Sequence, residues 1–203
     1  MNSTIQYIKN HRSIRSYTDK PVTDEELHAV LDAAYSMPSS INGQQVSVVV
    51  IKDPERKRRI AEIAGGQTWI EQAPVFVVYL ADMYKTSLAG DKIGHPQVIH
   101  ESSEGLMVSV FDAGLAMAAS IIAAESLGLG IVPIGGIRRD PQAIIDLLEL
   151  PSYTYPIAGL VIGHPADHSA QKPRLSKSSF IHLEKYQIEG LKDAVDQYDQ
   201  VMA

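Results

Sequence analysis

Two short basic motifs lie near opposite ends of this sequence. His11-Arg12-Ser13-Ile14-Arg15 combines two guanidinium groups, an imidazole and a hydroxyl, and Lys172-Pro173-Arg174 adds an ammonium and a third guanidinium. Arginine forks and lysine point charges bind phosphate dianions by charge-assisted hydrogen bonds. Because the formal net charge of the chain is −6, four cations in two short motifs indicate a small phosphorylated ligand. Scattered surface cations are the alternative interpretation of either motif alone.

The composition narrows the class of protein. With 203 residues, 45% hydrophobic and 21% charged, the chain is typical of a soluble globular protein, and we expect one domain over residues 1–203. The acidic balance argues against nucleic acid as a partner. The sequence holds no cysteine, which excludes disulfides and thiolate metal sites. Its first 20 residues lack the apolar core of a signal peptide, so a cytoplasmic location is expected.

One apolar stretch, from Leu106 to Ala124, is long enough to cross a membrane. Asp112 lies in its middle, and a carboxylate there is costly in lipid. The stretch is also rich in Ala, Ser and Gly. We therefore expect a helix buried against several neighbours and no membrane association.

The elements that must position the motifs follow from capping and periodicity. Thr23 and Glu26 form a capping-box pattern that begins a helix to about Tyr35. Asp53-Pro54 and Asp140-Pro141 begin two further helices, and a polar helix runs from about Leu191. Apolar runs predict four buried strands, at residues 46–52, 75–81, 131–134 and 156–163. Such alternation indicates an α/β or α+β fold.

Several other motifs are weaker. The run Arg56-Lys57-Arg58-Arg59 fits a solvated helix face better than a nucleic-acid patch. Gly128-Leu129-Gly130 lies after a helix and before a strand, the reverse of a dinucleotide fingerprint. His164-Pro165-Ala166-Asp167-His168 lacks further ligands nearby, so no metal site is expected. No catalytic triad or carboxylate pair is found either, and a bound cofactor would therefore carry the chemistry of an enzyme.

Five motifs in one order are more specific. They are His11-Arg12-Ser13-Ile14-Arg15-x-Tyr17, Pro38-Ser39-Ser40-x-Asn42-x-Gln44, Gly65-Gly66-Gln67, Ile134-Gly135-Gly136-Ile137-Arg138 and Lys172-Pro173-Arg174. This series resembles the flavin-dependent nitroreductase superfamily, and most closely its oxygen-insensitive group A nitroreductases and NADPH:flavin oxidoreductases. The resemblance covers about residues 4–187.

The resemblance implies an α+β fold, with a mixed, mostly antiparallel sheet surrounded by helices, in an intertwined homodimer that binds FMN at its interface. It assigns the cofactor-binding residues by their place in the motifs. The phosphate and ribityl end would be held by Arg12, Ser13, Arg15, Lys172 and Arg174, with His11 in the same motif. Ser39, Ser40 and Asn42 would contact the flavin of the partner subunit. Gln67 would face the pyrimidine edge of the ring, and the backbone of Ile134, Gly135 and Gly136 would approach its N5 atom.

The implied activity is oxidation of NADPH or NADH in a ping-pong cycle, with nitroaromatics, quinones or free flavin as small-molecule electron acceptors. Longer group A members continue with an arginine-bearing segment linked to the 2′-phosphate of NADPH, whereas this sequence stops at Ala203. Arg138 matches a position near the nicotinamide pocket, and we expect NADPH to be favoured only modestly. The alternatives are a flavin-binding carrier or sensor without turnover, and other flavin chemistry such as dehalogenation or flavin breakdown.

Overall fold

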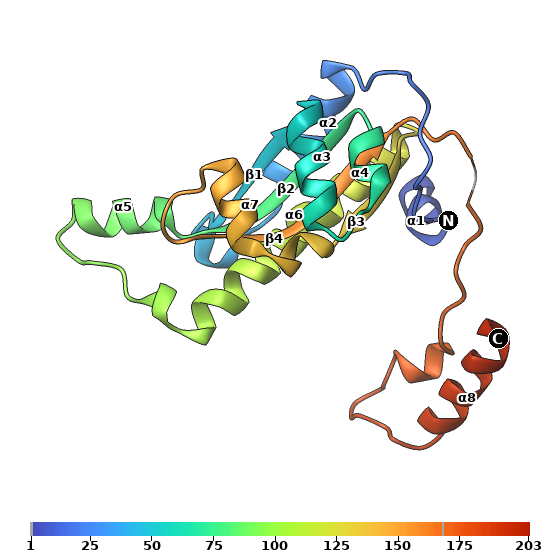
Figure 1. Ribbon diagram of the computed structural model, residues 1–203. Coiled ribbons are helices and arrows are strands. Elements are labelled where there is room, and N and C mark those ends of the chain that lie inside the picture. Colours follow the sequence, from blue (N-terminus) through green and yellow to red (C-terminus); the bar gives the residue numbers. More distant parts are fainter. Residues whose placement is uncertain (1, 168) are drawn as a thin grey trace. The chain divides into compact units, whose positions relative to one another are not determined.

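Four strands form one antiparallel sheet in the computed structural model, which describes residues 2–167 and 169–203. They lie in the order β1-β2-β4-β3 (Figure 1). Their bounds are β1 (Val46–Ile51), β2 (Val75–Asp82), β3 (Gly130–Ile134) and β4 (Thr154–Gly163). The register places Val46 opposite Ala81, and Ile162 opposite both Val75 and Ile131. β1 and β3 are therefore the two opposite edges of the sheet.

The helices begin where the sequence offers capping groups. Thr23 and Glu26 form the predicted capping box, and the side chains of Asp53, Ser102 and Asp140 each accept a backbone N–H of the helix that follows. The helix bounds are α1 (Ser3–Lys9), α2 (Asp24–Tyr35), α3 (Pro54–Ile63), α4 (Thr68–Gln72), α5 (Tyr84–Lys92), α6 (Ser103–Ser126), α7 (Pro141–Leu148) and α8 (Leu191–Met202). Four 3₁₀ turns are η1 (Ser40–Asn42), η2 (Ile99–Glu101), η3 (Gly136–Arg139) and η4 (Lys177–Ser179).

The sheet is covered on both faces, and the central strand β2 shows how. Val77 and Tyr79 belong to a core cluster with residues of α2 and α6, whereas Phe76 and Val78 belong to a second cluster with α3, α4 and α7. This division follows from the period of two along a strand. The result is three layers, with the sheet between two groups of helices. The predicted α+β class with helices around an antiparallel sheet is confirmed.

The long apolar helix α6 is packed against its own chain on one side only. α6 packs on α2 and the sheet through Ala113, Ala116 and Ala124, but its first half leaves large apolar side chains in solvent. The exposed fractions there are 55% for Leu106, 59% for Met107, 41% for Val110 and 67% for Phe111. Of the described helices, α6 alone has the length and composition of a membrane span. The chain itself therefore covers only part of this apolar helix.

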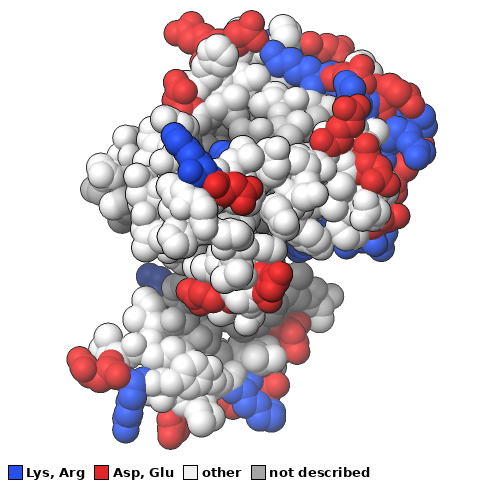
Figure 2. Space-filling model, turned by 90° about the vertical axis from the view of Figure 1, so that its left-hand side faces the viewer, with Lys and Arg blue, Asp and Glu red and all other residues white. Residues whose placement is uncertain are grey.

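The basic run of α3 is also only partly a solvated face. Arg58 pairs with Glu55 at 2.5 Å and with Glu62, and Arg59 pairs with Glu62 at 2.7 Å. Lys57, in contrast, is buried and donates its Nζ–H to the carbonyl oxygen of Ala73. Burial lowers the pKa of the Lys57 ammonium. Charges of both signs intermingle on the face of the molecule shown in Figure 2.

The chain divides into two compact units after Ser169. The larger unit holds the sheet and α1 to α7. The smaller unit, residues 170–203, consists of η4, α8 and extended segments, with Phe180, Leu183, Tyr186 and Ile188 all at least 70% exposed. The single domain expected over residues 1–203 stays a prediction.

Candidate functional site

The N-terminal basic motif is fixed to the edge of the sheet. Ile14 donates its backbone N–H to the carbonyl oxygen of Ile131 at 2.9 Å, and Ser13 forms a parallel bridge with the same residue. Ile14 is buried, so its neighbours Ser13 and Arg15 face the other way in this extended segment. The alternation therefore places the Ser13 hydroxyl and the Arg15 guanidinium on one side, beside the start of β3.

The side chain of Tyr17 holds the extended segment around Ile14 in place. Its hydroxyl donates a 2.6 Å hydrogen bond to the carbonyl oxygen of Ile14. Burial raises the pKa of Tyr17 well above its ordinary value, while the charge of Arg15 lowers it to a smaller extent, so the hydroxyl remains a donor. Tyr17 also forms a bridge with Pro165, just after β4. The motif is thus tied to both β3 and β4.

His11 is held by the last turn of α6. Its Nδ1 lies 2.6 Å from Oε1 of Glu125, and Glu125 is largely buried, with 14% of its side chain exposed. Arg12 donates through Nε to the carbonyl oxygen of Asn10 at 3.3 Å. Arg12, Ile14, Glu125 and Gly130 line a cavity of about 300 Å³ at this place. A carboxylate that accepts from one ring nitrogen fixes the orientation of an imidazole.

A second cluster lies at the other end of β3. Gln67 donates through Nε2 to the carbonyl oxygen of Ala64 at 2.9 Å. A Cβ atom at Gly136 would lie 2.5 Å from this Nε2 and 2.6 Å from the Ala64 oxygen. Glycine is therefore required at position 136 by the packing of the chain itself, in addition to any close approach of a ligand.

The side chains of three arginines lie close to this second cluster. Arg138, an exposed residue, donates through Nη1 to the carbonyl oxygen of Ile157 on β4, and its Nη2 lies 3.2 Å from where a Cβ of Gly135 would stand. The Arg139 guanidinium lies directly over Gly65, whose φ of +91° few side chains tolerate. Arg15 approaches the same region, because its guanidinium lies 5.6 Å from the ring centroid of Trp69.

The structure thus brings several predicted residues to one edge of the sheet. His11, Arg12, Ser13 and Arg15 lie at the start of β3, and Ile134, Gly135, Gly136, Gln67 and Arg138 lie at its end. The two ends of β3, from Ile131 to Gly135, are about 13 Å apart at the rise of a strand. One elongated ligand can contact both ends.

The Ser39–Asn42 loop lies elsewhere. It precedes β1, at the opposite edge of the sheet, and the backbone N–H of Ser40 donates to both carboxylate oxygens of Asp112 at 3.2 Å. Asp112 and Glu125 are both on α6, where 13 residues correspond to about 20 Å along the helix axis. Ser39, Ser40 and Asn42 are therefore separated from the His11 motif within one chain.

Lys172 and Arg174 belong to the smaller unit. Both are exposed, and Arg174 donates through Nη1 to the carbonyl oxygens of Lys172 at 3.2 Å and Pro173 at 3.3 Å. Their convergence with the N-terminal motif stays a prediction. Among the residues that the structure describes, no group of three or more His, Cys, Asp or Glu is arranged to hold a metal. His168 lies outside the described residues.

Three residues of this site were not assigned from the sequence. They are Trp69 beneath Arg15, Glu125 beside His11 and Asp112 under the Ser40 loop. Asp112 and Glu125 could have been singled out from the sequence, because a charge inside or directly after an apolar stretch has to be offset by a specific partner. Trp69 could not, since its place beside Arg15 depends on how α4 packs.

Comparison with known proteins accords with this geometry. The model of the nitroreductase family matches residues 8–164, which is more than half of the chain. The chain belongs to the nitroreductase family. The family membership expected from the five motifs is confirmed.

Individual family members are similar over the whole chain. FMN reductase [NAD(P)H] of Bacillus subtilis (strain 168) is 49% identical over 205 residues, covering 100% of this chain and 82% of that protein. The solved structure of NfrA2 from B. megaterium has a TM-score of 0.98 at 47% identity, with the same coverages of 100% and 82%. The structure of NADPH:FMN oxidoreductase from Vibrio harveyi complexed with NAD+ has a TM-score of 0.93 at 34% identity, covering 99% of this chain and 85% of that one.

Proposed function

We propose that this member of the nitroreductase family is a cytoplasmic, homodimeric FMN-dependent oxidoreductase that oxidises NAD(P)H and reduces small molecules such as nitroaromatics, quinones or free flavins. The observation that carries the proposal is the pair of clusters at the two ends of β3. One is cationic and the other is built around glycine backbone and an amide side chain. This is also the function expected from the five motifs, and it agrees with the names of the relatives.

The residues at the start of β3 fit the phosphate of such a cofactor. Arg12 and Arg15 supply guanidinium donors, Ser13 supplies a hydroxyl, and His11 supplies a ring that Glu125 orients. Charge-assisted hydrogen bonds of this kind are the strongest that proteins offer to a dianion. We expect Lys172 and Arg174 to complete this set.

The residues at the end of β3 fit a planar ring. Gln67 presents an amide, which can donate to and accept from a pyrimidine edge. Gly135 and Gly136 add no side chain, so the backbone can approach the ring closely. When bound, FMN supplies the two-electron chemistry that links NAD(P)H to the acceptor. The chain itself binds and orients the reactants there, and no side-chain acid or base is needed.

A homodimer accounts for the two features that one chain leaves incomplete. The first half of α6 exposes Leu106, Met107, Val110 and Phe111, and large contiguous apolar surface of this kind marks an interface. The Ser39–Asn42 loop lies beside this surface and far from the His11 motif along α6. A second copy packed on α6 would bring that loop to the partner's cofactor, as the resemblance implies.

Two measurements test the proposed function. The purified protein should be yellow, with the absorption spectrum of about one oxidised FMN per chain. It should also oxidise NADPH or NADH in the presence of menadione or a nitroarene. A protein that binds FMN but oxidises neither electron donor would be a carrier or sensor, and a colourless protein that does not take up added FMN would exclude the assignment of the cofactor site.

A further inference from the structure

We propose that Asp112 is a positioning residue, which holds the Ser39–Asn42 loop in the conformation that binds the cofactor. The inference rests on the proposed function, because that function assigns this loop to the flavin of the partner subunit. It adds a residue that acts through the loop, and it gives Asp112, the buried carboxylate in the middle of the apolar helix α6, a specific task.

Asp112 is buried, and in the described part of the chain its carboxylate accepts hydrogen bonds from one group alone. Its exposed fraction is 3%, and both of its carboxylate oxygens lie 3.2 Å from the backbone nitrogen of Ser40. Burying a carboxylate is unfavourable unless hydrogen bonds or opposite charges offset its loss of water. Here one shared backbone N–H is the only such contact among the described residues, so the contribution of Asp112 to stability alone does not explain its place.

The loop that Asp112 holds is strained. Ile41, Asn42 and Gln44 have φ angles of 49°, 56° and 53°, in the left-handed region that L side chains rarely adopt. Ile41 is β-branched, for which this conformation is especially unfavourable, and its side chain is 95% exposed. Strained backbone persists where surrounding contacts determine it, and it is concentrated at functional sites.

The hydrogen bonds of the loop divide into two kinds. Three close the loop on itself, from Asn42 N–H to the Ser39 carbonyl oxygen at 3.0 Å, from Gly43 N–H to the Ser40 carbonyl oxygen at 2.8 Å, and from Gln44 N–H to Ser39 Oγ at 3.0 Å. The bond from Ser40 N–H to Asp112 instead joins the loop to a different element, α6. The hydrogen bond between Ser40 and Asp112 therefore fixes the position of the loop relative to α6, whereas the other three fix the conformation of the loop itself.

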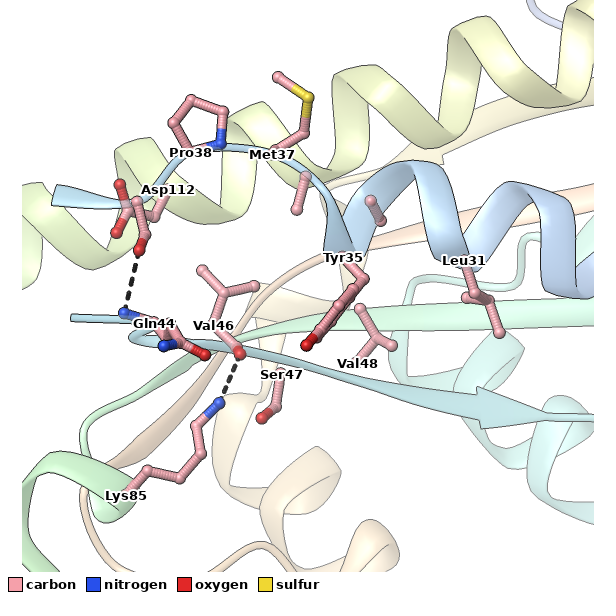
Figure 3. Close-up of a pocket in the computed structure, with 13 residues that line it drawn as sticks. Leu31, Tyr35, Met37, Pro38, Gln44, Val46, Ser47, Val48, Lys85 and Asp112 are labelled. Carbon is pink, nitrogen blue, oxygen red and sulfur yellow. Dashed lines mark hydrogen bonds between the residues drawn. The ribbon is translucent and has the colours of Figure 1, made fainter. Parts of the chain in front are cut away.

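Asp112 stands between two cavities, which makes this bond the local support of the loop. Figure 3 shows Asp112 projecting from α6 beside the chain that runs from Met37 to Gln44. A cavity of about 270 Å³ lies on one side, and one of about 550 Å³ lies on the other. Ser39 and Asp112 line both. With open space on each side, packing alone does not hold Ser39 and Ser40.

The second cavity relates this support to assembly. Met107 and Phe111, on the exposed apolar part of α6, line it together with Ser40 and Asp112. One helix thus carries the surface that a second copy would cover and the carboxylate that holds the loop. Asp112 fixes the loop relative to that surface, so the loop arrives at the partner's cofactor in a defined position.

The test is the FMN dissociation constant of Asp112→Ala and Asp112→Asn holoprotein, measured by flavin fluorescence with the dimer confirmed by light scattering. Asparagine keeps an oxygen that can accept from Ser40 N–H, and alanine does not. We expect Asp112→Ala to bind FMN at least tenfold more weakly as an intact dimer, and Asp112→Asn to stay within threefold of the wild type. Equal affinity in all three proteins, or equal loss in both variants, would overturn the inference.

A matched control separates positioning from stability. Ser120→Ala changes another buried polar residue of α6, whose hydroxyl bonds Tyr79 at 2.6 Å far from the loop. It should lower the melting temperature of the apoprotein and leave FMN affinity unchanged within twofold. If Asp112→Ala does not fold, hydrogen exchange at the Ser40 amide of the wild-type holoprotein decides. Slow exchange is expected, and exchange at the rate of an unstructured peptide would overturn the inference.

These results are distinguishable from failure of the proposed function. Wild-type protein that does not bind FMN at all would contradict the proposed function. Wild-type protein that binds FMN and loses it on Ser40→Ala, but not on Asp112→Ala, would contradict only the role of Asp112.

Discussion

The first half of α6 and its C-terminal end hold two parts of the candidate site in different ways. At the C-terminal end, Glu125 bonds His11 at 2.6 Å, and the motif that follows is tied to β3 by a backbone hydrogen bond. In the first half of the helix, Asp112 holds a strained loop, beside apolar side chains that remain in solvent. The first part is organised by the core of one chain. The second lies beside an apolar surface that the described part of its own chain leaves exposed.

The difference shows what a single chain can and cannot complete. Around Glu125, its Oε1 pairs with His11 and the backbone of Ile14 bonds Ile131 on β3, so these contacts form within one chain. Around Asp112 the exposed Met107 and Phe111 give the helix an apolar surface that its own chain does not cover. The comparison therefore predicts that disturbing the exposed apolar face of α6 affects assembly and cofactor together, whereas disturbing the contact of Glu125 with His11 affects the cofactor alone.

The largest effect should come from a charge on the exposed face of α6. We expect Phe111→Asp to shift the protein from dimer to monomer and to weaken FMN retention at least hundredfold, because a carboxylate in an apolar interface loses its hydration without gaining a partner. Light scattering gives the mass, and the ratio of flavin to protein absorbance gives the retention.

The control is at the same position. Phe111→Leu keeps an apolar side chain and should preserve both dimer and flavin. Ala116 would be an unsuitable site, since it is 5% exposed and packs in the core of its own chain, so a charge there would unfold the protein. A yellow wild-type protein with the mass of one chain would contradict the assignment of this face.

A smaller effect is expected from the cations predicted to bind the phosphate. Arg15→Ala or Arg174→Ala should weaken FMN binding tenfold or more without changing the mass of the dimer, since a charge-assisted hydrogen bond contributes about 1.5–3 kcal/mol. Arg58→Ala is the matched control, because its guanidinium pairs with Glu55 and Glu62 on the surface of α3. Equal FMN affinity in all three variants would contradict the assignment of the phosphate site to Arg15 and Arg174.

Much of the fold was predictable because its signals are local. The capping box at Thr23, the proline helix starts and the four apolar strands all appear where the sequence placed them, within about two residues. The short helices α4 and α5 were not predicted. Their sequences lack a clear apolar period, and tertiary packing decides their conformation.

The site was predictable in part for the same reason. Motif order identified the family, but contacts between distant segments are not written in local spacing. The pairing of His11 with Glu125 joins residues 114 positions apart, and that of Ser40 with Asp112 joins residues 72 positions apart. The residues that make up the exposed face of α6 were not predicted either, because composition reports that a helix is apolar without reporting which neighbour covers each side.

A still smaller effect should follow from Glu125. We expect Glu125→Ala to weaken FMN binding about three- to tenfold, as for loss of one hydrogen bond that orients a binding residue, of about 0.5–1.5 kcal/mol. Glu125→Gln, which keeps an acceptor for His11 Nδ1, should restore most of the affinity. Titration of apoprotein with FMN measures both. A change in dimer mass in either variant would contradict the distinction between the C-terminal end of α6 and its first half.

The smallest effect concerns the choice of electron donor, at the far end of β3. A 2′-phosphate is distinguished from a hydroxyl by cations, and the arginines of the larger unit nearest the Gly135-Gly136 backbone are Arg138 and Arg139. The Arg138 guanidinium already donates to the Ile157 carbonyl oxygen, and Arg139 lies over Gly65, so neither is wholly available to a further anion. We therefore expect NADPH to be favoured over NADH by tenfold or less, which is about 1.4 kcal/mol and near the low end for one charge-assisted contact. The ratio of kcat/KM for the two electron donors, with menadione as acceptor, measures this preference. Arg138→Ala should bring the ratio close to one, while Arg58→Ala should leave it unchanged. A preference above a thousandfold would require a phosphate pocket built from residues other than these two arginines.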